Sequence, residues 1–328
     1  MNTRKRDDIM VKKVPIGRDD FKEVIEENLY YVDKTRIIEE LLDKKKYVTL
    51  FPRPRRFGKS LFISMLDNFF NIEYKDTNKN LFDGLYISKS EYYSYLSSKP
   101  VIKLDFKELK KDTYEELYAS FKELIISLYT KYEFILDRLS SGEQDIFNSI
   151  KKGIAEVVRY EKSIKYLSEM VYKYYNIKPI ILIDEYDVPI ERGYINNFYD
   201  DVVKLIRNVF SNALKGNHSI SFAVMTGVLR VSKESLFSDL NNVDVYNMTD
   251  KDYNEYFGFT ENETKKLLDY YGLNLDEEVK NMYDGYNFGG IHIYNPWSVL
   301  KYAERRELEP YWVNTSGNEL IIKVIKKL

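Results

Sequence analysis

Near the N-terminus, a short apolar strand, a turn-rich loop and an amphipathic helix follow one another without interruption. Residues 47–51 (YVTLF) are strong β-formers, and residues 52–58 (PRPRRFG) contain the proline and glycine typical of a loop. Residues 60–70 (SLFISMLDNFF) then carry apolar side chains at helical spacing. Because such a helix must pack its apolar stripe on a sheet, this strand–loop–helix unit predicts a layered α/β fold.

Four further strand candidates occur along the chain, and helical segments separate them. The candidates are residues 101–106, 179–184, 219–226 and 243–248. The segment 179–184 (PIILID) is apolar at consecutive positions, as expected for a central parallel strand that is covered on both faces. This alternation of strands and helices predicts a doubly wound parallel sheet.

The pattern divides the chain into a core at 1–250 and a C-terminal region at 251–328. Within the core, a capping box and apolar residues at helical spacing predict a helical insertion at about 107–178. Beyond residue 250, short helical patterns are broken by the turn-prone runs GFT, DGYNFGG and YNPWS, and no buried strand is evident. We therefore expect a small helical lid there.

The tripeptide Gly58-Lys59-Ser60 lies where the first strand candidate passes into its helix. A helix N-terminus with successive backbone N–H groups suits bound phosphates; Lys59 would reach the β- and γ-phosphates, and the Ser60 hydroxyl would reach Mg²⁺. The usual GxxxxGK[ST] pattern opens on a glycine, which Arg53 replaces here. The tripeptide alone is therefore a weak signal, and its position between strand and helix gives it weight.

A second, independent signal is the sequence ILIDE at 181–185, an apolar strand that ends in two carboxylates. Asp184 is placed to hold Mg²⁺, either through water or through Ser60. Glu185 is placed to polarise an attacking water as a general base, a role that separates ATP hydrolysis from ATP binding alone. The alternative is an acidic pair that only caps the next element.

Two groups of polar side chains near these motifs also have open alternatives. Arg53, Arg55 and Arg56 would supply bidentate phosphate contacts in place of glycine-loop amides. They would otherwise form a solvated turn or touch a nucleic-acid backbone. Thr226 ends the strand candidate at 219–226 and Arg230 follows it, where they would either sense the γ-phosphate or serve as a turn threonine and a surface arginine.

The composition limits the classes of partner. Lys plus Arg total 50 and Asp plus Glu total 52, a net charge of −2, so the chain has no global attraction to nucleic acid or to an anionic membrane. Lysine clusters at 44–46 and 323–327 leave local nucleic-acid contacts open, although solvated helical faces explain them more simply. Without cysteine, a signal peptide or a membrane-length apolar run, we expect a cytoplasmic protein that does not contact a membrane.

Seven motifs in order resemble one family, the AAA-ATPase-like proteins. They are YYVDKT (30–35), PRPRRFGKS (52–60), ILIDEYDVPI (181–190), TGVLRVSKESLFSDLNN (226–242), YDGYNFG (283–289), YNPWS (294–298) and YWVNTSGN (311–318). The resemblance implies an additional-strand P-loop NTPase with strand order 5-1-4-3-2, in which an arginine-rich loop replaces the glycine-rich one. It further implies that Arg230 is a sensor arginine and that residues 31–35 lie near the adenine.

The nucleotide-binding set predicted from the motifs and the resemblance has eleven members, and ATP and Mg²⁺ are its expected cofactors. The members are Tyr31, Asp33, Arg53, Pro54, Arg55, Arg56, Phe57, Gly58, Lys59, Ser60 and Leu61. The set places one group of loop residues around the phosphates and a second group, Tyr31 and Asp33, beside the base.

The family usually carries a C-terminal domain similar to PD-(D/E)XK nucleases, and this sequence stops at Leu328, so we expect no nuclease activity from it. Either that missing domain or a partner protein would receive the output of the nucleotide site. Three hypotheses remain open. The first is an ATPase that drives a change in a lid or partner, the second is a nucleotide-gated switch with negligible turnover, in defence or nucleic-acid processing, and the third is a scaffold that binds no nucleotide.

Overall fold

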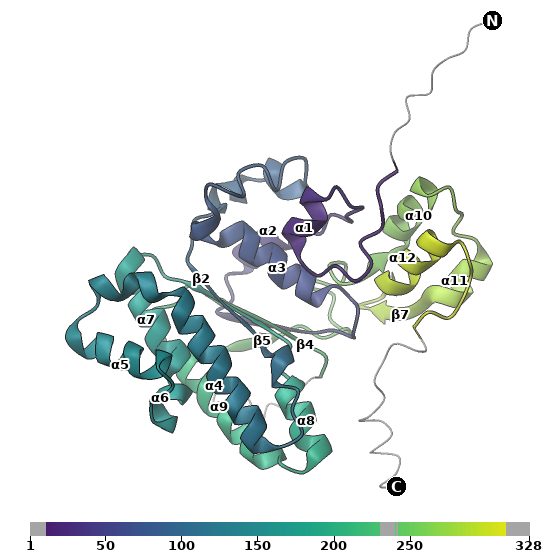
Figure 1. Cartoon of the computed structure of the whole chain (residues 1–328). Helices are drawn as coiled ribbons and strands as arrows, with labels where there is room; N and C mark the ends of the chain where they lie inside the picture. Colours follow the sequence, from purple (N-terminus) through teal and green to yellow (C-terminus); the bar gives the residue numbers. More distant parts are fainter. Residues whose placement is uncertain (1–10, 230–239, 241, 313–328) are drawn as a thin grey trace, which may run out of the picture.

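The computed structural model describes residues 11–229, 240 and 242–312, and it contains an α/β core with a smaller α+β module beside it (Figure 1). The core is built on a five-stranded sheet in which every pairing is parallel. Across the sheet, the strands are β2 (Val101–Asp105), β3 (Ile180–Asp184), β4 (Ala223–Gly227), β1 (Val48–Pro52) and β5 (Val243–Val245). From the β5 edge the order is therefore 5-1-4-3-2, and the predicted α/β class with a parallel sheet is confirmed.

Helices cover both faces of this sheet (Figure 1). One face carries α1 (Phe21–Glu26), α2 (Arg36–Lys44) and α3 (Lys59–Phe70), and the other carries α4 (Tyr114–Lys131), α7 (Ser163–Tyr175) and α9 (Tyr199–Leu214). Along β3, Ile181 and Ile183 enter the core shared with α4, α7 and α9, whereas Ile180 and Leu182 enter the core shared with α1 to α3. Side chains alternate along a strand, so two buried faces require a continuous apolar run, and this is why the sequence reads PIILI here.

The segment between β2 and β3 is helical, and α8 follows β3. Besides α4 and α7, the segment contains η4 (Phe106–Leu109), η5 (Glu133–Arg138), α5 (Ser141–Lys151) and α6 (Val157–Glu161), and α8 spans Val188–Asn196. Three short 3₁₀ turns, η1 (Ile72–Tyr74), η2 (Tyr86–Lys89) and η3 (Glu91–Tyr95), connect α3 to β2. The capping box at Ser140 and Glu143 starts α5. Within the described residues, no helix has the length and apolar character needed to cross a membrane.

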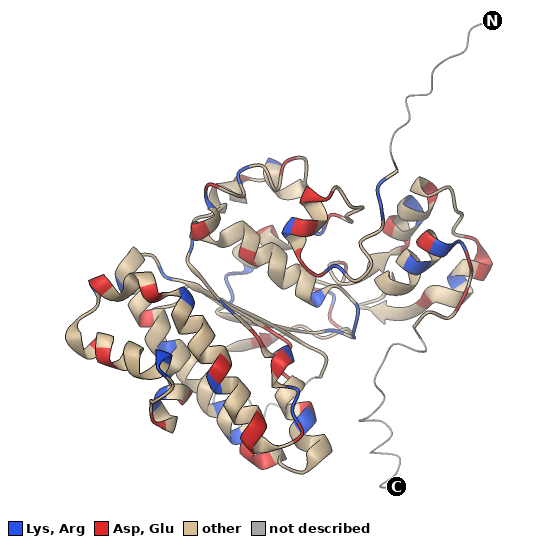
Figure 2. Ribbon diagram, in the orientation of Figure 1, with Lys and Arg blue, Asp and Glu red and all other residues tan. Residues whose placement is uncertain are grey.

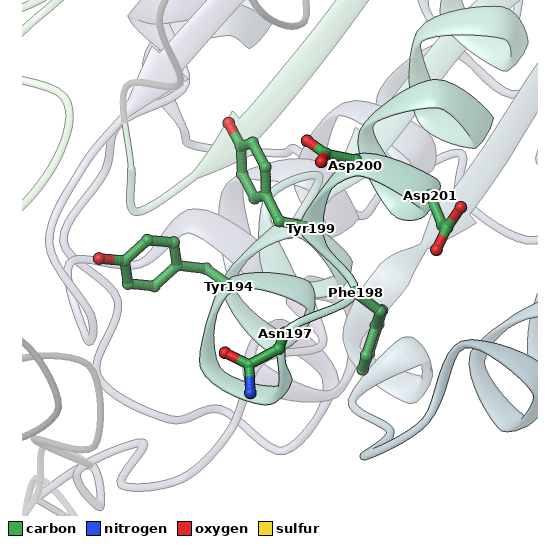
Figure 3. Close-up of a pocket in the computed structure, with 6 residues that line it drawn as sticks. All are labelled: Tyr194, Asn197, Phe198, Tyr199, Asp200 and Asp201. Atoms are coloured by element: carbon green, nitrogen blue, oxygen red, sulfur yellow. The ribbon is translucent and has the colours of Figure 1, made fainter.

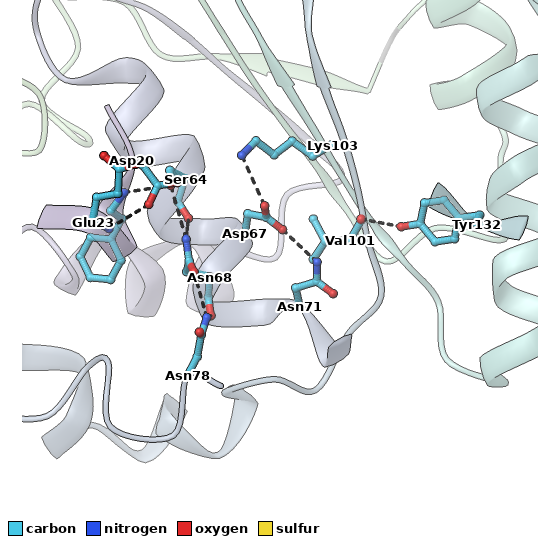
Figure 4. Close-up of polar contacts among 11 residues, drawn as sticks. Asp20, Glu23, Ser64, Asp67, Asn68, Asn71, Asn78, Val101, Lys103 and Tyr132 are labelled. Carbon is cyan, nitrogen blue, oxygen red and sulfur yellow. Dashed lines mark hydrogen bonds and ion pairs between the residues drawn. The ribbon is translucent and has the colours of Figure 1, made fainter. Parts of the chain in front are cut away.

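Polar side chains hold α3 in place along its length (Figure 4). The Ser64 hydroxyl accepts from the Phe21 amide at 3.0 Å and donates to Asp20 at 3.2 Å. One turn on, Asp67 accepts from Asn71 at 3.0 Å and pairs with Lys103 of β2 at 3.4 Å. These bonds fix the helix against α1 and the sheet, and they therefore fix the loop that enters its N-terminus.

The C-terminal region differs from the predicted helical lid, because it contains a sheet. This sheet is antiparallel, and its strands lie in the order β6 (Phe259–Thr260), β8 (Ile291–Tyr294) and β7 (Asp284–Phe288). It packs with the helices α10 (Glu261–Tyr270), α11 (Glu277–Tyr283) and α12 (Pro296–Arg305). The hairpin between β7 and β8 turns at Gly289 and Gly290, whose φ angles are 54° and 94°. The run DGYNFGG is thus a strand and its turn. Strands of two to five residues are too short to show a clear alternation of apolar and polar side chains in the sequence.

We call residues 258–305 the C-terminal module, and the N-terminal segment ties it to the core. Val14, Ile16, Tyr30 and Val32 pack against the apolar cluster of this module. The Lys34 ammonium pairs with Glu263 at 2.6 Å. The N-terminal segment and the C-terminal module, which are far apart in sequence, therefore pack against each other.

Candidate functional site

The loop between β1 and α3 contains two residues in the left-handed region of backbone space. Gly58 has φ 81° and immediately precedes α3, and Arg56 has φ 69°. Glycine adopts such a conformation without strain, whereas an arginine there is uncommon. At the start of the loop, the Arg53 amide donates to the Gly227 carbonyl at 2.9 Å, so the loop is joined to the end of β4. Amides at the start of α3 face outward from the carboxyl edge of the sheet, where an anion is stabilised.

Lys59 begins α3 and its side chain is buried. The ammonium donates to the Pro54 carbonyl at 3.0 Å, across the loop. Burial lowers the pKa of Lys59, while the carboxylates of Asp187, Asp184 and Glu185 act in the opposite direction. The buried Lys59 side chain is therefore held near three acidic groups at and just beyond the end of β3, the strand on the far side of β4 from β1.

Asp184 and Glu185 stand at the end of β3, next to the end of β4. The buried Asp184 carboxylate accepts from the Thr226 hydroxyl and from the Glu185 amide, the latter at 3.0 Å. Glu185 has φ 53°, a strained conformation for a residue with a side chain. Burial, with Asp184 and Asp105 nearby, raises the pKa of Glu185. The structure thus brings together the predicted Lys59, Asp184, Glu185 and Thr226.

Asp187 is a further member of this group that the sequence analysis did not single out. It is 2% exposed, and its Oδ2 accepts from the amides of Val228 at 2.9 Å and Leu229 at 2.6 Å. Its Oδ1 is buried without a hydrogen-bond partner, and burial raises the pKa of the carboxyl. Any Cβ on Gly227 would come within 2.5 Å of that oxygen, so the last position of β4 requires glycine. The signal that could have found Asp187 is a third carboxylate just past the strand end.

The three loop arginines have different environments, and Arg53 departs from the prediction. Its guanidinium is fully buried and donates to the carbonyls of Pro52 at 3.0 Å, Tyr246 at 2.6 Å and Tyr253 at 3.4 Å. Three aromatic rings surround the guanidinium. Its carbon lies 5.9 Å from the ring centroid of Phe51, 5.0 Å from that of Phe257 and 5.5 Å from that of Phe288. An arginine one place after an apolar strand can turn inward beneath the loop, and here it braces the loop instead of facing a phosphate.

The other two arginines are exposed at the loop surface. Arg55 pairs with Glu191 of α8 at 3.1 Å, and Arg56 lies over the ring of Trp297 from α12. Phe57 points inward, and its ring contacts those of Tyr286 and Phe288 in β7. The predicted phosphate loop therefore contacts both α8 and the C-terminal module.

The two residues predicted to lie near the base make internal contacts. The Tyr31 hydroxyl donates to the Met65 sulfur at 3.5 Å, and its ring meets that of Phe21 edge-on. Asp33 accepts from the amide and hydroxyl of Thr35 at 2.8 and 2.7 Å. Ser60 and Leu61 lie in the first turn of α3. Arg230, the predicted sensor arginine, is outside the described residues.

A cavity of about 180 Å³ opens beside Glu185 at this edge of the sheet. Its lining is strongly charged and contains Arg55, Lys107, Lys110, Glu185, Asp187, Val188, Glu191, Arg192 and Val228. A second hollow, of about 550 Å³, lies between α8 and α9 (Figure 3) and contains none of the predicted site residues. Over the helices that the structure describes, basic and acidic residues are interspersed (Figure 2). The charged cavity is therefore a local feature next to the general-base candidate.

The residues present fit ATP and Mg²⁺. The N-terminus of α3 and the buried Lys59 suit a phosphate chain, and Asp184 with the Ser60 hydroxyl supplies the oxygen donors that Mg²⁺ prefers alongside phosphate and water. Within the part of the chain that the structure describes, no group of three or more His, Cys, Asp or Glu side chains could enclose a metal on its own. That suits Mg²⁺, which is usually bound through one or two carboxylates plus substrate phosphates.

Comparisons with known proteins give the same family as the motifs. A family model described as "Predicted AAA-ATPase" matches residues 15–237, more than half of the chain. A protein from Azotobacter chroococcum mcd 1, described as "Uncharacterized protein in vnfD 5'region", is 30% identical over 319 residues. That match covers 96% of this chain and 56% of the relative, so the chain spans just over half the length of that relative. The resemblance seen in the motifs is confirmed, and the chain belongs to the AAA-ATPase-like family.

Proposed function

We propose that the protein binds ATP with Mg²⁺ and hydrolyses it as an additional-strand P-loop NTPase. The observation that carries the proposal is the buried Lys59 ammonium at the start of α3, opposite the carboxylates of Asp184, Glu185 and Asp187. Membership of the AAA-ATPase-like family supports it. So does the position of β4 between β1 and β3, the extra strand that this class inserts between the phosphate-loop strand and the acidic one.

Each side chain has a role that its surroundings suit. Lys59 and the amides at the start of α3 would bind the phosphates, and Ser60 and Asp184 would hold Mg²⁺, which neutralises phosphate charge when bound. Thr226 orients Asp184 by donating to it. Glu185 would accept the proton of the attacking water, and its raised pKa brings it nearer to neutral pH, where a general base works best.

A second candidate is a nucleotide-gated switch with negligible turnover. The contacts of Arg56 and Phe57 with the C-terminal module favour it, because a change in the loop would be transmitted directly to α12 and β7. In either case, we propose that the nucleotide state alters the conformation of the C-terminal module or of a partner protein.

Removing Mg²⁺ tests the proposal. Phosphate release from ATP by the purified protein should proceed with Mg²⁺ and cease with excess EDTA, because the phosphate charge is then not neutralised. Ser60→Ala should need a higher Mg²⁺ concentration for half-maximal release. Binding of ATP without release would favour the switch, and neither binding nor release would contradict both candidates.

A further inference from the structure

Arg56 and Trp297 form a stacked pair between the candidate phosphate loop and the C-terminal module. The guanidinium carbon of Arg56 lies 3.9 Å from the centroid of the Trp297 ring. Trp297 stands in the first turn of α12, where Asn295 accepts from the Ser298 amide at 3.3 Å and caps the helix. An arginine stacks on an aromatic face through both cation–π attraction and planar contact. This pair accounts for the tryptophan of the motif YNPWS, to which the proposed function assigns no role.

Arg56 differs from the other two arginines of the loop in its polar contacts. The two terminal nitrogens of the Arg53 guanidinium, Nη1 and Nη2, donate to backbone carbonyls, and Arg55 is paired with Glu191. Among the residues that the structure describes, none forms a hydrogen bond or an ion pair with the Arg56 guanidinium, and that side chain is exposed. Stacking uses the face of the guanidinium and leaves its edge, with all its N–H donors, free for an anion.

The backbone around Arg56 is fixed to the same module. The Phe57 ring lies 4.7 Å from that of Tyr286 and 5.5 Å from that of Phe288, both in β7. The Gly258 amide donates to the Phe57 carbonyl at 3.3 Å. A Cβ at Gly258 would come within 2.8 Å of the Phe57 ring, so this close approach requires glycine. The left-handed backbone of Arg56, two residues before Gly58, is held between these contacts and the start of α3.

We propose that Trp297 positions the Arg56 guanidinium to contact the phosphate chain of the bound nucleotide, so that the C-terminal module sets nucleotide affinity through this one arginine. The inference rests on the proposed function. Arg56 is the direct contact, because its free N–H edge matches two phosphate oxygens. Trp297 is a positioning residue that acts through Arg56, because an unsupported arginine would lose side-chain freedom on binding and would bind phosphate less tightly.

The test is the dissociation constant of ATP with Mg²⁺ for four variants, measured by calorimetry. Arg56→Ala should weaken binding by about 10- to 100-fold, the range expected for a lost charge-assisted contact. Trp297→Leu should weaken it by several-fold, whereas Trp297→Phe, which keeps an aromatic face, should bind nearly as the wild type does. In the double variant, Trp297→Leu should add no further loss to that of Arg56→Ala, since the ring acts through the arginine.

Intrinsic fluorescence supplies a second readout, which does not depend on turnover. In a Trp312→Phe background, Trp297 is the remaining tryptophan of the chain. Its emission should change when ATP binds, and adding Arg56→Ala should abolish that change even at saturating ATP. Thermal unfolding without nucleotide shows whether each variant is folded.

Two outcomes would overturn the inference. One is wild-type affinity in Arg56→Ala, and the other is additive losses in the double variant, which would give Trp297 a structural role of its own. Lys59→Ala separates this failure from failure of the proposed function. If Lys59→Ala loses ATP binding while Arg56→Ala keeps it, the result supports the nucleotide site and contradicts the role proposed for Arg56. If Lys59→Ala also binds ATP normally, the proposed function itself fails.

Discussion

Glu185→Gln is expected to lower the rate of phosphate release by about 10²- to 10⁴-fold, the usual contribution of a general base, and to leave ATP affinity within about two-fold of the wild type. Glutamine keeps the size of the side chain but cannot accept a proton from water. The change is nearly isosteric at a position whose backbone already has φ 53°, so we expect the fold to persist. Rapid measurement of phosphate release, together with the dissociation constant of ATP, separates turnover from binding.

The pH dependence of the same reaction provides a signature of this residue. Burial and the neighbouring Asp184 and Asp105 raise the pKa of Glu185, and a base works only when it is deprotonated. The rate should therefore fall as the pH drops through that raised pKa, at a higher pH than for an ordinary glutamate. The residual activity of Glu185→Gln should lack this decline. Glu169→Gln, an exposed change on α7, is the matched control, and a wild-type rate in Glu185→Gln would remove Glu185 from the mechanism.

Arg53→Ala is expected to destabilise the protein by about 3–5 kcal/mol, because it leaves a cavity and removes the donor from three backbone carbonyls. Burial lowers the pKa of Arg53 to about 10, so the side chain remains charged at neutral pH and its hydrogen bonds are charge-assisted. Denaturant unfolding measures the change. Arg55→Ala in the same loop is the control: its ion pair with Glu191 is partly exposed, so its loss should cost less than about 1 kcal/mol.

The same variant distinguishes the observed role of Arg53 from the one predicted from sequence. A bracing residue affects the free energy of unfolding first, and the folded fraction of Arg53→Ala should still bind ATP. An unchanged free energy of unfolding combined with a large loss of ATP affinity would contradict the bracing role and support the phosphate contact that was predicted from sequence.

Sequence reasoning succeeded where a local pattern determines the structure. The run PIILID required a strand buried on both faces, and Gly58-Lys59-Ser60 required a turn into a helix, and both are present. The proximity of Asp184 to Lys59 followed because the carboxyl ends of parallel strands share one edge of a sheet. These predictions needed only the period of side chains along a strand and the conformational preference of glycine.

The remaining features depend on contacts between distant segments. Whether Arg53 faces a phosphate or turns inward depends on Tyr246 and Tyr253, about 200 residues away. The β7–β8 hairpin is stabilised by pairing and by the packing of Phe288, so its short strands carry no strong local signal. Asp187 belongs to the site only because the turn after β4 brings the amides of Val228 and Leu229 to it.

Thermal unfolding with and without ATP and Mg²⁺, for the wild type and Lys59→Ala, tests the nucleotide site most directly. A ligand at ~100 times its dissociation constant stabilises the folded state by about 2.7 kcal/mol, which is a shift of several degrees. We expect that shift in the wild type and its loss in Lys59→Ala, because the ammonium that faces the phosphates is gone. An equal shift in both proteins, or a shift in neither, would contradict the assignment of Lys59 to a nucleotide site.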